Sequence, residues 1–186
     1  SNLLRQSEKS DTQTLNVYRL IFALDLMESG SEYLQLAQLA RDAGLPGEAE
    51  TVMRKGLAAG LFTNPADKAQ AQQLLDDVVR LAAEDRKELP RLEAEAKAAK
   101  AGDADVLLGE AFLSYGQTDK AVEALRRGLG KGVKNADEAN LLLGKALMKA
   151  GNAAEAAAAF AKVTGAEFGQ LGSLWNILAT GGLPSA

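Results

Sequence analysis

The residue types that most often carry chemistry are scarce in this chain. It contains no histidine and no cysteine, so the commonest general base, the usual zinc ligands and all thiol nucleophiles are missing. The remaining candidates are paired carboxylates and one glycine-rich segment. The sequence therefore predicts no catalytic residue, no metal site and no cofactor.

Two carboxylate clusters, Asp76-Asp77 and Glu93/Glu95, are of a kind that a hydrolase could use. Adjacent residues on a helix point in different directions, so Asp76 and Asp77 are poorly placed to share a proton. We expect these carboxylates to lie on solvated helix faces. A hydrolase is the least favoured of the functions considered.

The segment Gly128-Leu129-Gly130-Lys131-Gly132 has a faint likeness to a phosphate-binding loop. A phosphate loop needs an earlier glycine, where this chain has Leu125, and a hydroxyl residue after its lysine, where this chain has Gly132. The segment is therefore predicted to be a helix C-terminus with a basic turn. Because Lys131 would then be solvated, Lys131→Ala is expected to change stability by less than about 0.5 kcal/mol.

One spacing of small and bulky residues occurs three times. It predicts the secondary-structure elements that carry the candidate residues described above. The glycines Gly44, Gly116 and Gly151 mark its copies and are 72 and 35 residues apart. A period of about 34 to 36 residues is typical of a solenoid of helix pairs, in which each pair buries its apolar face against its neighbours. The copies are Tyr33-Leu36-Ala37-Ala40-Gly44-Ala49-Met53-Gly56, Asp105-Leu108-Gly109-Phe112-Gly116-Ala121-Leu125-Gly128 and Asn140-Leu143-Gly144-Leu147-Gly151-Ala156-Phe160-Val163.

Each position of the pattern has a physical role. Small residues on both helices, such as Gly109 and Ala121, allow close approach, and bulky residues such as Phe112 and Leu125 fill the space between them. The glycine before each second helix is expected to end the first helix in a left-handed conformation. Gly109→Leu or Ala121→Leu should therefore be destabilising by about 1–3 kcal/mol or more.

The pattern resembles the tetratricopeptide repeat (TPR) over residues 31–58 and 102–164. It departs from the TPR motif in lacking the early tryptophan and the late proline. The segments 17–20, 43–49 and 108–116 are similar to the C-terminal part of long, poorly characterised proteobacterial TPR proteins. Because many of these carry signal peptides, the resemblance favours the periplasm or cell envelope, with the cytoplasm as the alternative.

This resemblance implies an all-α fold: a right-handed α-α superhelix, or TPR-like solenoid, of about ten helices. Residues 1–10 are expected to be a tag remnant and a disordered lead, and residues 11–186 a single solenoid. Its expected parts are clear repeats at 31–60, 102–132 and 136–165, a degenerate repeat at 64–101 and a terminal helix at 167–180.

Helix-boundary signals refine this expectation. The first helix should run from Thr12 to about Glu28, and Asn64-Pro65 should open a long helix. Pro90 should end or kink that helix. Asn135 and Asn152 each stand three residues before a glutamate and are predicted helix caps.

Composition excludes several classes of partner. The net charge of −4 argues against nucleic-acid binding. No run of eighteen apolar residues occurs, so no membrane span is predicted. Without cysteine there is no disulfide, and either compartment is compatible with that.

The resemblance implies a non-catalytic module that binds a peptide or helix of a partner protein on its concave face. In TPR proteins this face is lined by set positions of each first helix. The positions that would bind a chaperone C-terminal carboxylate lack the required lysine, arginine and asparagine. Some of the leucines could instead pack against neighbouring helices. The candidate residues are Leu34, Gln38, Arg41, Val106, Glu110, Leu113, Ser114, Leu141, Lys145, Met148 and Lys149.

Two alternatives remain open. The chain could be an architectural spacer within a longer superhelix, or it could self-associate as a homodimer through its first helix. That helix is apolar nearly all round, and Tyr18, Ile21 and Phe22 would form an open apolar patch. The helix after Pro65 or the helix of Trp175 could instead cover that patch.

Overall fold

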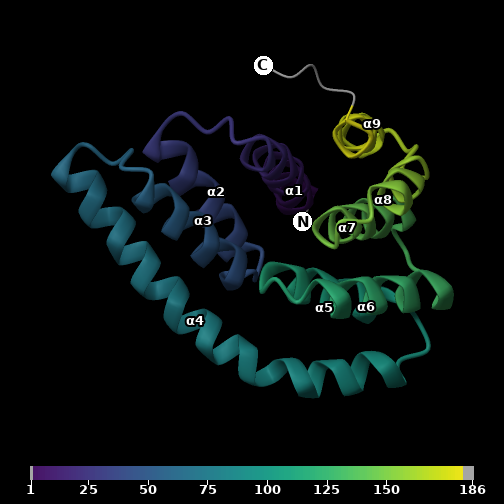
Figure 1. Cartoon of the computed structure of the whole chain (residues 1–186). Helices are drawn as coiled ribbons and strands as arrows, with labels where there is room; N and C mark the ends of the chain where they lie inside the picture. Colours follow the sequence, from purple (N-terminus) through teal and green to yellow (C-terminus); the bar gives the residue numbers. More distant parts are fainter. Residues whose placement is uncertain (1, 182–186) are drawn as a thin grey trace. The chain divides into compact units, whose positions relative to one another are not determined.

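The structure, a computed structural model, describes residues 2–181, with side chains from residue 11 onward. Within this range it contains nine helices and no strand, which confirms the all-α prediction (Figure 1). The helices are α1 (Asn2–Ala23), α2 (Gly30–Asp42), α3 (Pro46–Ala58), α4 (Pro65–Ala98), α5 (Asp103–Ser114), α6 (Thr118–Lys131), α7 (Ala136–Lys149), α8 (Ala153–Phe160) and α9 (Gly169–Ala179).

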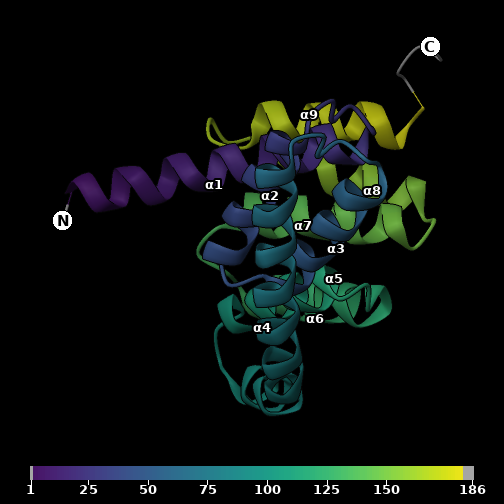
Figure 2. The same ribbon diagram turned by 90° about the vertical axis from the view of Figure 1, so that its left-hand side faces the viewer.

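The chain divides into two compact units, Ser1–Lys87 and Glu88–Ala186. In the first unit, α2 packs on α3 and α1 packs on α2. In the second unit each helix from α5 to α9 packs on the next; α5 and α6 lie side by side in both views (Figures 1 and 2). Helix α4 contributes residues to both units.

The small residues of the repeated pattern lie where paired helices touch. A Cβ atom added to Gly109 would come within 2.5 Å of Leu125, and one added to Gly144 within 2.4 Å of Phe160. Ala121 and Ala156 on the opposing helices are fully buried. Such distances leave no room for a side chain, so the predicted helix crossings are confirmed in α5–α6 and α7–α8.

The turns inside the three pairs share one geometry, as the spacing predicted. Gly44, Gly116 and Gly151 have φ angles of 77°, 68° and 77°, in the left-handed region. The residue after each glycine donates its N–H to the carbonyl five residues earlier, as in Gln117 N to Phe112 O at 2.9 Å. This is the hydrogen bond of a Schellman turn, which satisfies a carbonyl at the end of the first helix.

The helix starts agree with most of the boundary signals. The side chains of Asn135 and Asn152 accept hydrogen bonds from the N–H groups of Glu138 and Glu155. Asn64 likewise accepts from the N–H of Ala66 at 2.9 Å, and α4 begins at Pro65. These caps satisfy backbone donors that have no partner within the helix.

The ends of α1 differ from the prediction. The helix begins at Asn2, so residues 2–10, expected to form a disordered lead, continue it. No glycine or proline interrupts this segment, and several of its residues are good helix formers. The helix also ends earlier than expected, at Ala23, and Asp25 takes a left-handed φ of 59° in the following turn.

Of the two outcomes predicted for Pro90, an end of the helix or a kink in it, the end does not occur. A single helix, α4, runs through this residue, so residues 64–101 do not form a degenerate pair of helices. Proline removes one N–H from the helical ladder. Leu89 and Ala96 are buried on either side of Pro90, and this packing favours the helix on both sides of the defect.

Candidate functional site

The first helices of the pairs are neighbours in the second unit. Helix α7 contacts both α5 and α9, while α6 and α8 are the second helices of their pairs. The first helices therefore form a contiguous row, and the predicted binding positions in this unit come from α5 and α7. Helix α9 extends the row, which the sequence analysis did not anticipate.

Helix α7 contributes the most accessible of these positions. Lys149 is exposed, and Lys145 and Met148 are half-buried. The ammonium of Lys145 lies 5.8 Å from the ring centroid of Trp175 on α9, within the range of a cation–π contact. Leu141, by contrast, is 1% exposed and belongs to the core. The leucine expected on the binding face thus packs inside the protein.

Helix α5 presents fewer accessible side chains to a partner than the sequence predicted. Leu113 is buried, and Val106 lies against α6, where its Cγ2 would be 3.3 Å from a Cβ at Gly128. The Ser114 hydroxyl donates to the carbonyl of Ala111 at 2.8 Å. Glu110 is the charged residue among the predicted binding residues of α5, and its side chain is half-buried.

Helix α2 lies in the first unit, so its predicted residues form a separate group. Leu34 is half-buried and packs against the hydrophobic core. Gln38 and Arg41 are half-buried, and Arg41 forms an ion pair with Asp42 at 2.9 Å. An exposed pair of this kind contributes little to stability.

The residues predicted to form an open patch on α1 face their own core. Phe22 makes an edge-to-face contact with Tyr33 at 6.1 Å, and the Tyr18 hydroxyl donates to Gln35 at 2.7 Å. Ile21, with Tyr18 and Phe22, is half-buried against the core cluster of the first unit. Helix α2 therefore covers this face within the first unit.

A buried ion pair, which the sequence analysis missed, fixes α1 to α3. The guanidinium of Arg19 makes two hydrogen bonds to the Glu48 carboxylate, at 2.8 and 2.6 Å. The Arg19 side chain is 8% exposed. Both residues lie in segments that the sequence analysis singled out, 17–20 and 43–49, but neither segment alone indicates that they meet.

The carboxylates considered for hydrolysis lie on α4 and have partners. Asp77 pairs with Arg80 at 2.8 Å, and Glu95 with Arg91 at 2.5 Å. A hydrogen bond from Lys97 holds the pKa of Glu93 below its usual range, the opposite of what a general acid requires. Asp76 and Asp77 belong to the first unit, and Glu93 and Glu95 belong to the second.

The glycine-rich segment ends α6 as predicted, but its lysine is not solvated. Lys131 Nζ lies 2.8 Å from Oδ2 of Asp105, a residue that is fully buried. It also donates to the carbonyl of Ala96 at 2.7 Å, near the end of α4. Arg127 binds the other oxygen of Asp105. The cluster of Asp105, Arg127 and Lys131 thus joins α4, α5 and α6.

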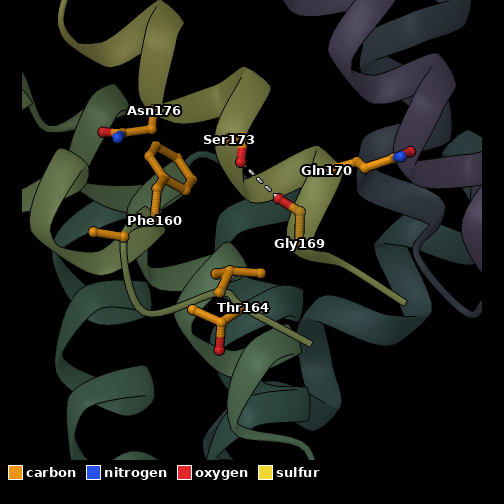
Figure 3. Close-up of a pocket in the computed structure, with 8 residues that line it drawn as sticks. Phe160, Thr164, Gly169, Gln170, Ser173 and Asn176 are labelled. Carbon is orange, nitrogen blue, oxygen red and sulfur yellow. Dashed lines mark hydrogen bonds between the residues drawn. The ribbon is translucent and has the colours of Figure 1, made fainter. Parts of the chain in front are cut away.

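A surface pocket of about 380 Å³ lies where α8 meets α9 (Figure 3). We name it the α8/α9 groove. Most of its side chains are small, and the Ser173 hydroxyl donates to the Gly169 carbonyl at 2.9 Å. The amide oxygen of Asn176 is buried and has no hydrogen-bond partner among the described residues. The lining residues are Phe160, Ala161, Val163, Thr164, Gly169, Gln170, Ser173 and Asn176.

Among the described residues, no set of three acidic, histidine or cysteine side chains is grouped so as to hold a metal ion. None of the described helices combines the length and the apolar character that crossing a membrane requires. Comparison of the chain with protein-family models, curated proteins and solved structures found no match.

Proposed function

We propose that this chain is a TPR-like protein-binding module whose first helices hold a peptide or helix of a partner protein. The observation that carries the proposal is the row of α5, α7 and α9 in the second unit. Glu110, Lys145 and Lys149 provide both signs of charge along it, beside the half-buried Met148. Such a surface suits an amphipathic segment, which presents apolar and charged groups together.

The repeated helix pairs support the TPR-like part of the proposal. The same turn follows Gly44, Gly116 and Gly151, and the small residues occupy crossings in successive pairs. Repetition of one pair geometry generates a superhelix when the pairs stack. We propose that the right-handed superhelix of TPR proteins describes the stacking in this chain.

Self-association through α1 and the turn after it is a second candidate function, favoured by two exposed apolar residues. Val17 is 47% exposed and Leu26 59% exposed. Both lie outside the patch first predicted, because Tyr18, Ile21 and Phe22 pack inward. A symmetric homodimer would have to bury Val17 and Leu26 instead. If the chain is an architectural spacer, neither Val17 nor Leu26 is expected to contact a second copy.

Site-specific photo-crosslinking in the cell of origin tests the binding proposal. A photoreactive residue at Met148, on first helix α7, should capture a partner. One at Glu123, exposed on second helix α6, is the matched control and should capture none. Mass spectrometry of the crosslinked peptides identifies what is held.

Charge reversal at two positions then tests the surface itself. The double variant Lys145→Glu, Lys149→Glu should weaken capture at Met148 by a partner with acidic groups, and more strongly at low salt. Crosslinks confined to second helices would contradict the proposal. A dimer that Val17→Asp dissociates, without any crosslink at Met148, would favour self-association.

A further inference from the structure

We propose that α4 contains a hinge between Arg86 and Pro90, about which the two compact units change their relative orientation. Two independent observations coincide in this segment. The boundary between the units lies between Lys87 and Glu88, and the proline inside the helix, Pro90, follows at once. A residue that weakens a helix therefore stands where the chain passes from one unit to the other.

Proline weakens a helix on its N-terminal side. Pro90 has no N–H group, so the carbonyl of Arg86, four residues earlier, has no helical donor. The proline ring also crowds this carbonyl and disfavours helical geometry at Leu89. Sharp bends in helices occur mostly at positions of this kind. Bending between Arg86 and Pro90 therefore breaks fewer backbone hydrogen bonds than bending elsewhere in α4.

The side chains around the boundary put little constraint on such a bend. Of residues 83–88, all of which the structure describes, none is buried, and burial resumes at Leu89. Lys87 and Glu88, on either side of the boundary, are both exposed. Changes in their backbone torsions would not have to displace a packed core, which is typical of a segment of low local stability that acts as a hinge.

On each side of this segment, α4 is fixed to its own unit. In the first unit Val78 is fully buried, and the Arg86 guanidinium lies 3.2 Å from the carboxylate of Glu50 on α3. In the second unit Ala96 is 1% exposed, and its carbonyl accepts a hydrogen bond from Lys131 on α6 at 2.7 Å. Each half of the helix thus moves with its own unit, and the bend is confined to the few residues between them.

Two exposed ion pairs of Arg91 hold the helix together around the proline. Arg91 lies 2.9 Å from Glu88, which precedes Pro90, and 2.5 Å from Glu95 in the next turn. All three charged side chains are more than half exposed. Exposed ion pairs are weak and are screened by salt. We therefore expect these pairs to favour the continuous helix without preventing the bend.

A hinge in α4 has a consequence for partner binding. The predicted binding residues of α2 lie in the first unit, and those of α5 and α7 lie in the second. A partner that contacts both groups would select the orientation that fits it. This consequence rests on the proposed function, whereas the hinge itself does not. Tests of the hinge need no partner, so their failure would leave the proposed function standing.

Distances between spin labels test the hinge. The chain has no cysteine, so cysteines introduced at the exposed residues Ala58 of α3 and Glu123 of α6 carry the labels. Double electron–electron resonance should give a broad distribution of distances between the two units. Pro90→Ala should narrow this distribution, because it restores a helical donor. Pro65→Ala, at the start of α4, should leave it unchanged.

A label pair within the second unit controls for mobility of the labels themselves. Glu123 and the exposed Ala158 of α8 should give a narrow distribution in every variant. A distribution between the units that is as narrow as this control would overturn the proposal. A broad distribution that Pro90→Ala leaves unchanged would also overturn it. Circular dichroism and urea unfolding establish that the labelled variants are folded.

Two arginines of α4 test the role assigned to the ion pairs. Arg91→Ala should broaden the distribution between the units, and added salt should do the same to the unsubstituted chain. Arg80 is the matched control, because it pairs with Asp77 and Glu84 at the same spacings but wholly within the first unit. Arg80→Ala should therefore leave the distribution unchanged. Equal effects of the two substitutions would overturn the role of Arg91.

Residual dipolar couplings test the hinge on the chain without any substitution. The amides of α2 and α3 are fitted separately from those of α5 to α8. A hinge should give the two units alignment tensors of different magnitude, because each unit averages over its own orientations. A single tensor that fits both sets of amides would overturn the proposal.

Discussion

The ammonium of Lys131 lies 2.8 Å from the buried carboxylate of Asp105. Sequence reasoning assigned Lys131 to a solvated turn, but its side chain is only 20% exposed and also binds the end of α4. A cation near the last carbonyls of a helix is favourable. The lysine thus stabilises a buried charge and a helix C-terminus together.

Lys131→Ala should consequently destabilise the protein by about 1–3 kcal/mol, in place of the negligible effect first expected. Loss of one partner leaves Asp105 with incomplete charge compensation, although Arg127 remains. Urea unfolding measures the difference in free energy. The exposed Lys134 is the control, and Lys134→Ala should change stability by less than about 0.5 kcal/mol. Equal effects of the two substitutions would contradict the role of the cluster.

Two glycines test the helix crossings with the same substitution. Gly109→Ala should be destabilising by about 1–3 kcal/mol, because the added Cβ would lie 2.5 Å from a Leu125 carbon. Gly130 lies within α6 and has no neighbouring atom within 4 Å of an added Cβ. Gly130→Ala should therefore stabilise by about 0.4–1 kcal/mol, by reducing the freedom of the unfolded chain. Thermal unfolding of both variants gives the comparison, and a stabilising Gly109→Ala would show the α5–α6 packing to be wrong.

A third prediction concerns pH and the start of α2. The hydrogen bond from the Ser29 hydroxyl, followed by those from the N–H groups of Glu28 and Ser29, holds the pKa of Glu32 below its ordinary value. A carboxyl with a lowered folded-state pKa contributes stability above its unfolded pKa, and this contribution is lost as pH falls through the folded value. An NMR titration should show Glu32 titrating below the ordinary range of a glutamate carboxyl.

Ser29→Ala should raise the pKa of Glu32 toward the ordinary range, since it removes the largest cause of the shift. Thr51→Ala, at an exposed position of α3, should leave it unchanged. If Ser29→Ala does not alter the titration of Glu32, the hydrogen bond from the Ser29 hydroxyl is not the main cause of the shift.

The prolines of α4 give a fourth test. Pro90 lies inside the helix, where proline is unfavourable by about 3 kcal/mol relative to alanine. Pro90→Ala should therefore stabilise the protein, by about 1–3 kcal/mol once local relaxation is allowed for. Pro65 stands at the first position of the helix, where its missing N–H has no intrahelical partner. Pro65→Ala should give no gain, and equal gains in denaturant unfolding would contradict this difference.

Local spacing predicted the parts of the fold that depend on neighbours in sequence. The small residues at the crossings, the glycine turns and the asparagine caps all act within one helix pair or one turn. The pattern around Gly109 and Gly144 was sufficient because each glycine meets a residue of its own second helix.

The candidate site was harder to predict because it depends on which side of each helix a neighbouring pair covers. Leu141 was predicted to lie on the binding face, from the resemblance to TPR proteins, but it is buried. Asp105 and Lys131 come from different helices, and no local signal joins them. Helix α4 continues through Pro90 because buried residues on both sides support it, which a rule based on proline alone does not include.

The continuity of α4 also has a consequence for cooperativity. The helix supplies Ala71 and Val78 to the core of the first unit, and Leu89 and Ala96 are buried in its portion within the second. Loss of structure in either unit removes the support of one half of a shared helix. Hydrogen exchange should therefore find that amides around Pro90 open with the less stable unit, so that this segment reports the weaker of the two foldons.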